Sequence, residues 1–529
     1  MISIKTRLVL LISFLFSLAQ VNKAQYIFCK ENLMSNTLSD LVQTSDGGYV
    51  IGGTCDVLIN QNNDFQFIKT DASGNVLWTK TVGGAGIDWG YSLIQSSDKG
   101  LVMVGYTKSF GMGNDDVYVV KLDSIGNTLW TRTIGGTQNE VGTSIVQTLD
   151  GGYVIAGNTK SYGAGNNDTY IIKLDAAGNL AWTKTIGGPG NDSFLLGTSI
   201  IQTSDSGYAV AGCAQFDSQG LDLYLIKLNQ NGNLVWTKSV GGSAVEEPAE
   251  IVETSDKSYV IAGRTGSFGA SELYLVKFNS TGSLIWTKTY NPGGLSTCSG
   301  MCKTDDQGFV LIGKTNVFGG YYDAYMIKVD SVGSFQWSRG IGSSDGQVTV
   351  EPSKIIQSTD GGFAFCGGTR TFTNGPTFMS AYFAKLDANG NGCCMIAENT
   401  GTVGAGGSLN LTGGTASSGG TVSSGGSSAS AGSLTTICYA VGINEMVSSV
   451  QMQIGPNPLV DQMYLKIERN LDHASMKVYN SIGKVVKELT NLNGDNFILN
   501  RENLTNGFYL ITLTEGEKVI GSKKLIVSD

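Results

Sequence analysis

The chain has 529 residues and a formal net charge of -9. A chain of this length exceeds the roughly 250–300 residues that one hydrophobic core can serve, so more than one domain is expected. With 73 Gly and only 15% charged residues, the composition favours short strands joined by tight turns over long helices. The acidic balance provides no basic surface for phosphates, which excludes nucleic acid and anionic membranes as expected partners.

The N-terminus has the pattern of a secretory signal peptide. Lys5 and Arg7 precede an apolar run over Leu8–Leu18, and small residues follow at Ala19 and Ala24. We expect a signal peptide over residues 1–24, with cleavage after Ala19 or Ala24. The run is shorter than the roughly 20 residues of a membrane helix, so no transmembrane segment is expected; a membrane anchor is the alternative reading.

The dominant feature of the sequence is an internal repeat of roughly fifty residues, a period that is typical of solenoids, propellers or arrays. It is marked by Trp78, Trp130, Trp182, Trp236, Trp286 and Trp337, and Cys394 holds the seventh equivalent position. Seven units are therefore predicted over residues 25–398.

Each unit is predicted to contain four strands. In the second unit these are Ser92–Gln95, Leu101–Gly105, Val117–Leu122 and Thr128–Ile134. Asp marks the first hairpin of every unit, as at Asp98, and is followed by Gly in all units but the fifth. The second hairpin carries Asp or Asn with Gly at the spacing of a type I turn with a left-handed Gly bulge.

Two details of the unit favour a ring of packed sheets. The third strand is apolar on both faces, as expected for a sheet placed between two others. The second strand holds a Gly in each copy, such as Gly105, which we attribute to crowding between blades near the axis. An all-β, seven-bladed β-propeller meets both conditions, and Tyr26–Lys30 could add a strand to the last blade and close the ring. An open solenoid or a string of small sandwiches is the alternative.

The repeats resemble those of secreted bacterial β-propeller proteins, with DGGY, YxxKLD and GNxxW elements over about 370 residues. This resemblance implies a fold and hardly a function.

After the repeats, the residues between 401 and 432 are nearly all Gly, Ser, Thr and Ala. Such a segment buries too little apolar surface to order itself, so residues 399–440 are predicted to be a flexible linker. From 445 to 529 the composition recovers. Alternating runs predict a small Ig-like β-sandwich from the strands Met463–Ile467, Met476–Tyr479, Phe497–Leu499, Phe508–Leu513 and Lys523–Val527.

This C-terminal region resembles the type IX secretion C-terminal sorting domain. The resemblance rests on Pro456, Asn457 and Pro458, on VYNSIGKVV with Gly483, on LTNGFYLITL with Gly507 and Tyr509, and on KKLIV with Lys523 and Lys524. It implies a Bacteroidota-type cell, a type IX-like secretion machinery as partner, and a secreted or cell-surface location. An ordinary Ig-like binding module is the alternative.

The sequence restricts the possible chemistry. The single His, His473, lies in the C-terminal domain, so catalysis with a His base is excluded from the propeller, and no catalytic residue is predicted. The repeated Trp is interpreted as packing between blades. Trp89 belongs to no repeated position and is the best candidate for an aromatic ligand contact.

Acidic residues in the loops between blades form the second candidate group. They could converge at one mouth of the channel and hold Ca²⁺ or a cationic ligand, or they could simply be solvated. The group comprises Asp88, Glu140, Asp192, Glu246, Glu247 and Glu351.

The nine Cys are too sparse for a disulfide scaffold. Cys298 with Cys302 is a candidate local pair, and Cys29 could join Cys393 or Cys394.

Three functions remain open on this evidence. The leading one is an exported, non-enzymatic propeller that binds a glycan or a protein partner at the cell surface. A polysaccharide-degrading enzyme using loop carboxylates and a surface scaffold without a specific ligand are the alternatives.

Overall fold

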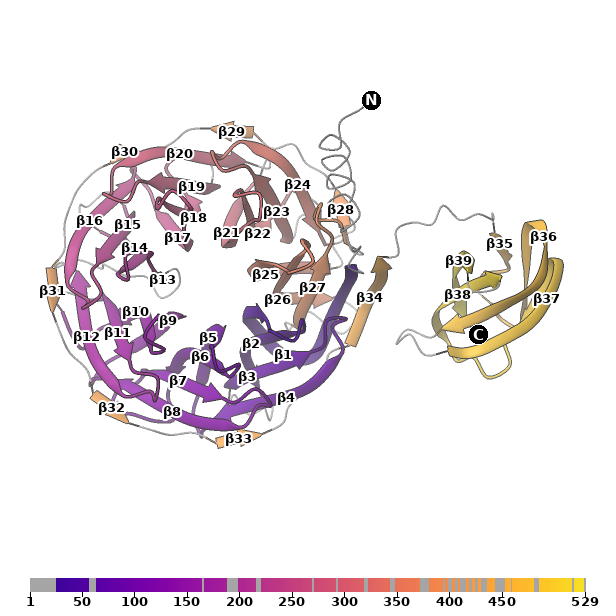
Figure 1. Ribbon diagram of the computed structural model, residues 1–529, viewed down its shortest axis with the longest axis horizontal. Coiled ribbons are helices and arrows are strands. Elements are labelled where there is room, and N and C mark those ends of the chain that lie inside the picture. The colour runs from indigo at the N-terminus through magenta and orange to yellow at the C-terminus, as the bar shows by residue number, and fades with distance from the viewer. Residues whose placement is uncertain are drawn as a thin grey trace, which may run out of the picture. The chain divides into compact units, whose positions relative to one another are not determined.

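A computed structural model places most of the chain in β-strands (Figure 1). It describes residues 25–56, 63–163, 166–187, 198–215, 220–268, 271–291, 294–317, 322–342, 348–371, 380–392, 395–397, 402–404, 408–409, 415–417, 421–423, 427–429, 435–442, 452–457, 459–479, 485–515 and 518–527. The predicted signal peptide and Asp192, Cys393, Cys394, Pro458 and Gly483 lie outside these residues. Within them, no helix has the length and apolarity needed to cross a membrane.

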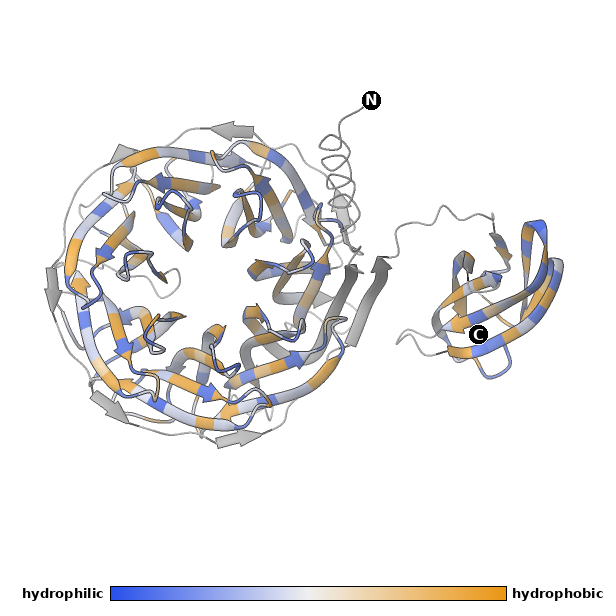
Figure 2. Ribbon diagram, viewed as in Figure 1, coloured by the Kyte–Doolittle hydropathy of each residue, from blue (hydrophilic) through white to orange (hydrophobic). Residues whose placement is uncertain are grey.

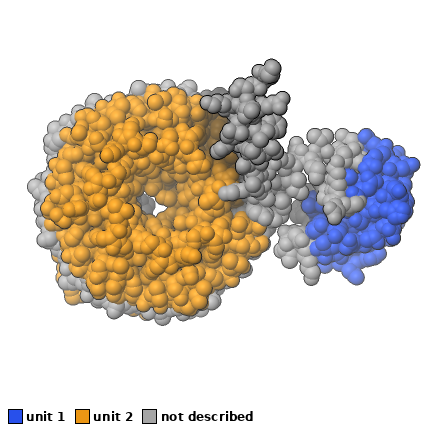
Figure 3. Space-filling model, viewed as in Figure 1, with its two compact units in different colours: residues 1–25, 439–529 blue, residues 26–438 orange. Residues whose placement is uncertain are grey.

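The chain divides into two compact units, residues 26–438 and a second unit that contains residues 439–529 (Figure 3). The first is a ring of four-stranded antiparallel blades, which confirms the predicted all-β propeller. Blades 1 and 2 contain β1 (Gln25–Gln43), β2 (Tyr49–Asp56), β3 (Asn63–Thr70), β4 (Val76–Gly83), β5 (Asp88–Gln95), β6 (Leu101–Thr107), β7 (Asp116–Leu122) and β8 (Thr128–Gly135). Blades 3 and 4 contain β9 (Glu140–Gln147), β10 (Tyr153–Thr159), β11 (Asp168–Leu174), β12 (Leu180–Gly187), β13 (Ser199–Gln202), β14 (Tyr208–Ala214), β15 (Asp222–Leu228) and β16 (Leu234–Gly241). Blades 5 to 7 contain β17 (Glu246–Glu253), β18 (Tyr259–Thr265), β19 (Glu272–Phe278), β20 (Leu284–Asn291), β21 (Ser296–Lys303), β22 (Phe309–Thr315), β23 (Asp323–Val329), β24 (Phe335–Ile341), β25 (Val348–Gln357), β26 (Phe363–Thr371) and β27 (Ser380–Leu386).

The first strand closes the ring. The beginning of β1 pairs with β27 of blade 7, with Phe28 opposite Lys385, and its end pairs with β2 of blade 1, with Leu41 opposite Ile51. The predicted contribution of Tyr26–Lys30 to the last blade is therefore confirmed.

Six short strands are added to the outer edges of the blades, and all but the first lie in the segment predicted to be a flexible linker, which differs from that expectation. They are β28 (Met395–Ala397), β29 (Thr402–Gly404), β30 (Ser408–Leu409), β31 (Thr415–Ser417), β32 (Thr421–Ser423) and β33 (Ser427–Ala429). They pair in turn with β24, β20, β16, β12, β8 and β4, and β34 (Thr435–Gly442) pairs with β1.

The core of the ring lies between neighbouring blades. One apolar cluster, for example, joins Val104 and Val119 of blade 2 to Ile155 and Ile172 of blade 3. Every residue of β7 is buried, because this strand has a sheet on each side. In Figure 2 hydrophobic residues follow the strands, and the turns are hydrophilic.

The repeated Trp packs between blades, as predicted. Trp130 of blade 2 lies 6.0 Å, centroid to centroid, from Tyr153 of blade 3. Its ring also abuts Gly178 in the second hairpin of blade 3, where a Cβ would lie 3.0 Å from the indole. Gly178 has a φ of +79°, so both the turn and the indole require glycine there.

The Gly of the second strand has a different cause from the predicted one. A Cβ on Gly105 would lie 1.8 Å from the carbonyl oxygen of Trp89, in the first strand of the same blade. A bulge between Gly90 and Ser92 shifts the register of this strand pair. The crowding thus arises within a blade and not between blades.

Buried lysines fix the first hairpin of each blade. In blade 2, Lys121 is 2% exposed and its ammonium lies 2.8 Å from the turn carboxylate of Asp98. The same pair occurs in every blade, as Lys69–Asp46, Lys173–Asp150, Lys227–Asp205, Lys277–Asp256, Lys328–Asp306 and Lys385–Asp360. Although burial opposes it, hydrogen bonds from Thr44, Lys69 and Gly48 hold the pKa of Asp46 at about 2.

In six of the seven blades, the side chain at the end of the first strand binds the first hairpin of the preceding blade. The Oε1 atom of Gln95 accepts a hydrogen bond of 2.9 Å from the backbone N–H of Ser45, and Gln147 does the same for Ser97. Gln202, Glu253, Gln357 and Gln43 repeat this bond in their blades. Blade 6 has Lys303 at this position, and an ammonium cannot accept a hydrogen bond.

The predicted Cys298–Cys302 disulfide is wrong. Both thiols are free, and they lie four residues apart along the single strand β21. At about 3.3 Å per residue, this spacing exceeds the reach of a disulfide. Burial raises the pKa of both thiols to about 12, which keeps them protonated and unreactive.

The second unit is a small β domain with its own apolar core (Figure 1). Its strands are β35 (Met452–Gly455), β36 (Gln462–Tyr479), β37 (Val485–Asn500), β38 (Gly507–Glu515) and β39 (Lys518–Val527). The first two predicted runs merge into β36, which pairs with β37 over most of its length and with β38 near its end.

Replacement of Lys303 by Gln tests the hairpin ties. Lys303→Gln supplies the missing acceptor and should raise the free energy of unfolding of the propeller by about 0.5–1 kcal/mol. Lys303→Met, which removes the charge without adding an acceptor, should give no such gain. Denaturant unfolding of both variants is the measurement. Equal stabilisation by the two variants would show that loss of the Lys303 charge, and not a new hydrogen bond to the hairpin, causes the gain.

Candidate functional site

The blades differ from one another at one pair of positions in their first two strands. This pair consists of the residue two positions before the bulge in the first strand and its cross-strand partner in the second strand, and we call it the mouth pair. The mouth pairs of blades 1, 2, 3, 5, 6 and 7 are Thr37–Thr54, Trp89–Tyr106, Val141–Asn158, Glu247–Arg264, Thr297–Lys314 and Glu351–Gly368. All first strands begin on the same side of the ring, so these pairs surround one mouth of the central opening, which is visible in Figure 3.

Blade 2 contributes an aromatic group to this mouth. Trp89 and Tyr106 are cross-strand partners and share a face of the sheet, and the ring of Tyr91 lies 6.1 Å from that of Tyr106. All three side chains are partly exposed. Burial, with help from Asp115 and Asp88, raises the pKa of Tyr106, so its phenol stays neutral and can donate a hydrogen bond.

Blades 5 to 7 contribute ion pairs to the same mouth. Arg264 donates two hydrogen bonds to Glu247, of 2.7 and 2.9 Å. Lys314 lies 2.7 Å from Glu351 and 4.9 Å from the ring centroid of Tyr322. Blade 2 lies across the ring from blades 5 and 6 (Figure 1), so an aromatic side of the mouth faces a charged side.

Deeper along the first strands, the residue after the bulge forms a polar ring around the channel. Its members are Asp40, Ser92, Ser144, Ser199, Glu250, Gly300 and Lys354. In the first four blades this residue accepts a hydrogen bond from the next blade. Asp40 accepts from the N–H of Leu93 at 2.8 Å, and Ser144 accepts from the N–H of Ile200 at 3.2 Å.

The polar ring changes character where Gly300 removes a side chain. Lys354 of blade 7 extends past blade 6 to Glu250 of blade 5, at 2.5 Å. Burial raises the pKa of both Glu250 and Asp40, and Lys354 opposes this rise. The channel is thus lined by hydroxyl groups on one side and by a partly buried ion triad on the other.

The predicted loop acids fall into three groups: some are buried, some form ion pairs, and one lies outside the described residues. Asp88 and Glu140 are fully buried and hold the loops between blades: Asp88 accepts from the N–H of Gly84 at 2.7 Å, and Glu140 from the N–H of Gly136 at 2.6 Å. Glu246 repeats this bond with Gly242. Glu247 and Glu351 reach the mouth but are ion-paired, and Asp192 lies outside the described residues.

The ion-pair partners Arg264 and Lys314, and the tyrosines near Trp89, could not be singled out from the sequence, because they occupy ordinary strand positions. Comparison of the copies position by position was the available signal. Among the described residues, no group of three or more His, Cys, Asp or Glu side chains is arranged to hold a metal ion.

The buried acids also form close carboxyl pairs between blades. Asp64, at the start of the third strand of blade 1, lies beside Asp88 of blade 2, and both crowd the backbone of Gly83. Burial and the charge of Asp88 raise the pKa of Asp64 to about 6.

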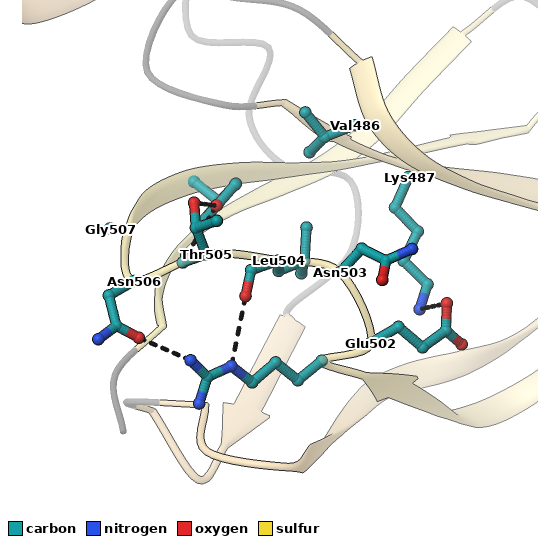
Figure 4. Close-up of a pocket in the computed structure, with 10 residues that line it drawn as sticks. Val486, Lys487, Glu502, Asn503, Leu504, Thr505, Asn506 and Gly507 are labelled. Atoms are coloured by element: carbon teal, nitrogen blue, oxygen red, sulfur yellow. Dashed lines mark hydrogen bonds and ion pairs between the residues drawn. The ribbon is translucent and has the colours of Figure 1, made fainter.

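The second unit contains a polar pocket of about 320 Å³ (Figure 4). Arg501 donates to the carbonyl oxygen of Leu504 at 3.3 Å and to the side chain of Asn506 at 2.7 Å, which fixes the loop before Gly507. Tyr509 donates to the carbonyl of Thr505 at 2.8 Å. The residues of the LTNGFY motif thus build the wall of this pocket. Asn457 does not line this pocket; it accepts a hydrogen bond from the N–H of Ile526 at 2.8 Å. Lys523 is exposed on β39.

Comparison with known proteins agrees with this division into two units. Residues 149–180 match the family described as a domain of unknown function (DUF5122) beta-propeller. The chain is therefore a β-propeller repeat protein. Residues 453–528 match the secretion system C-terminal sorting domain, so the second unit is a domain of that family and indicates a secreted or cell-surface protein.

Individual relatives are distant. The regulatory protein FlaEY of Caulobacter vibrioides is 27% identical over 177 residues, a match that covers 28% of this chain and 18% of that protein. The chain therefore spans less than a fifth of the length of this relative. A crystal structure of a protein of unknown function from Dyadobacter fermentans shares 10% identity, with a TM-score of 0.43, and covers 69% of this chain and 99% of that chain. The polysaccharide lyase Uly1 shares 10% identity, with a TM-score of 0.41, and covers 66% and 90%.

Replacement of Asp64 by Asn tests the carboxyl pair. An acid whose pKa is raised by folding stabilises the protein below its folded pKa, and this contribution is lost as the pH rises from about 4 to about 6. Asp64→Asn should therefore raise the free energy of unfolding by about 1–2 kcal/mol at pH 7.5 and have little effect near pH 4.

Asp305→Asn, at an exposed turn position, serves as the control and should leave the pH profile unchanged. Thermal unfolding across this pH range is the measurement. If Asp64→Asn stabilised the protein equally at both ends of the pH range, charge repulsion between Asp64 and Asp88 would be ruled out as the cause.

Proposed function

We propose that this protein is an exported glycan-binding propeller, and that the mouth formed by the mouth pairs is its binding surface. The observation that carries the proposal is the aromatic group of Trp89, Tyr91 and Tyr106. The mouth pairs of the other described blades are aliphatic, polar or charged. A repeat keeps what the fold needs in every copy, so a departure in one copy is a candidate for function.

The chemistry of the mouth suits a sugar. Partly exposed aromatic rings offer flat apolar surfaces, and ligand sites combine such surfaces with a few fixed polar groups. The ion pairs Arg264–Glu247 and Lys314–Glu351 supply fixed donors and acceptors on the opposite side. A neutral phenol at Tyr106 adds a further hydroxyl group.

The environment of the acids favours binding over polysaccharide cleavage. Glycoside hydrolysis uses one protonated carboxyl group and one free carboxylate that both face the substrate. Asp88 and Glu140 are buried under loop hydrogen bonds, and Glu247 and Glu351 are held by cations. The enzyme reading would require these groups to leave their partners, whereas stacking on Trp89 requires no rearrangement.

The sorting domain supplies delivery in this proposal. Its partner would be a type IX-like secretion machinery, which would leave the propeller outside the cell or on its surface. A surface protein as the ligand, and a scaffold without a specific ligand, are outcomes that the experiment below separates from a glycan.

Replacement of Trp89 tests the proposal. Screening of the purified full-length protein on a glycan array identifies the ligand, and titration then gives the affinity. Trp89→Ala should weaken binding roughly 10- to 100-fold, or about 1.4–2.8 kcal/mol, because truncation of a central Trp at a binding surface commonly costs about 2 kcal/mol. Trp89→Phe, which keeps a ring, should lose less.

Leu149→Ala is the matched control, because Leu149 lies in a first-strand hairpin at the opposite mouth and is 81% exposed. It should bind as the parent does. Absence of binding to any glycan, or equal loss in both variants, would refute the proposal. Turnover of a polysaccharide by the parent would support the enzyme instead.

A further inference from the structure

The outer edges of blades 1 to 6 are covered by short strands from residues 395–429, a segment that is nearly all Gly, Ser, Thr and Ala from residue 401. In each blade the fourth strand is outermost, and an outermost strand presents unpaired N–H and C=O groups that can recruit another chain. Here β28 to β33 pair with β24, β20, β16, β12, β8 and β4. We call these six short strands the belt strands; β29 to β33 are seen around the ring in Figure 1.

The order of pairing is regular and runs backwards. Each successive belt strand moves to the preceding blade, from blade 6 to blade 1, and the registers place it at the same end of every outer strand. Ala416 lies opposite Ile186 in blade 3, Val422 opposite Ile134 in blade 2, and Ser428 opposite Val82 in blade 1. One geometric rule therefore serves all these contacts.

The sequence of this segment has a short period of its own that matches this rule. Pairs of glycine occur at 406–407, 413–414, 419–420 and 425–426, and each directly precedes a belt strand, namely β30, β31, β32 and β33. One pair recurs for each of blades 4 to 1, whereas an unstructured spacer needs only a Gly-rich composition. The period therefore indicates a segment laid out to pair with a ring.

The belt strands lie at the buried end of the outer strands, where Ile134, Val82 and Val240 belong to the apolar clusters between blades. At the covered end of β8, Thr133 and Ile134 are 1% and 0% exposed, whereas Leu129 at the uncovered end is 56% exposed. The same contrast occurs in β4 and β16, where Val82 and Val240 are fully buried, and Leu77 and Val235 are more than half exposed.

We propose that the outer edges of blades 1 to 6 are strand-addition sites whose occupant is this chain's own segment 395–429, which is rich in Gly, Ser and Thr from residue 401. The belt strands bind through main-chain hydrogen bonds and so need small side chains, not specific ones. By occupying six edges, they prevent these edges from pairing with a second copy of the protein.

The test uses the full-length protein and hydrogen–deuterium exchange. In an antiparallel ladder every second residue exchanges hydrogen bonds with a given neighbour, so two adjacent prolines remove at least one bond from a belt strand. In the double variant Ala416→Pro, Ser417→Pro, the outward-facing amides of Thr185–Gly187 should exchange at least tenfold faster. Those of Val240–Gly241, which pair with β30, should be unchanged.

The matched control is Ala416→Val, Ser417→Thr, which keeps both amides and favours strand formation. It should retain full protection. Sedimentation velocity on a variant with adjacent prolines in β31, β32 and β33 provides a second readout, and it should show self-association that rises with concentration.

Two results would overturn the proposal. One is that, in the parent protein, the outward-facing amides of Thr185–Gly187 already exchange as fast as unprotected amides. The other is exchange and sedimentation that do not change in the proline variants.

Discussion

A sheet with two apolar faces cannot be stable alone in water, and this constraint organises the propeller. Strands such as β7 are buried along their whole length because blades 1 and 3 cover the two faces of blade 2. Each blade contributes half of two cores, so no blade is complete without both neighbours. A closed ring is the arrangement that satisfies all seven blades at once, and the hairpin ties and Trp contacts set the spacing between them.

The repeat made this fold predictable, because every element appears seven times with the same pattern. The four strands, their hairpins and the closing strand at Tyr26–Lys30 follow from apolar periodicity and turn residues. The cause of Gly105 was not predictable in the same way, because the bulge that turns the carbonyl of Trp89 towards it leaves no mark in the residue pattern. The pairing of the Gly/Ser-rich segment was missed for a related reason. Main-chain bonds carry that contact, so neither propensity nor hydrophobicity signals it.

The candidate site was only partly predictable. Trp89 was recognisable as a residue that departs from the repeat, and its cross-strand partner Tyr106 follows once the register is known. The roles of the loop acids could not be predicted from the sequence, because they depend on burial and on hydrogen-bond partners. Asp88 is the first residue of β5 and Glu247 the second of β17, yet the former holds a loop beneath the surface and the latter faces Arg264 at the mouth. A shift of one residue along a strand moves a side chain to the other face.

The double pairing of β1 has a consequence for how the protein is made. Blade 7 lacks its fourth strand until the first residues of the propeller pair with β27. The last sheet of the propeller to be synthesised is therefore completed by the strand that is synthesised first. The entropic cost of bringing such distant segments together grows only logarithmically with chain length, so late closure remains feasible. The ring consequently stays open between blades 7 and 1 throughout synthesis of the propeller. Loss of its first few residues would destabilise blade 7, which lies at the opposite end of the propeller sequence.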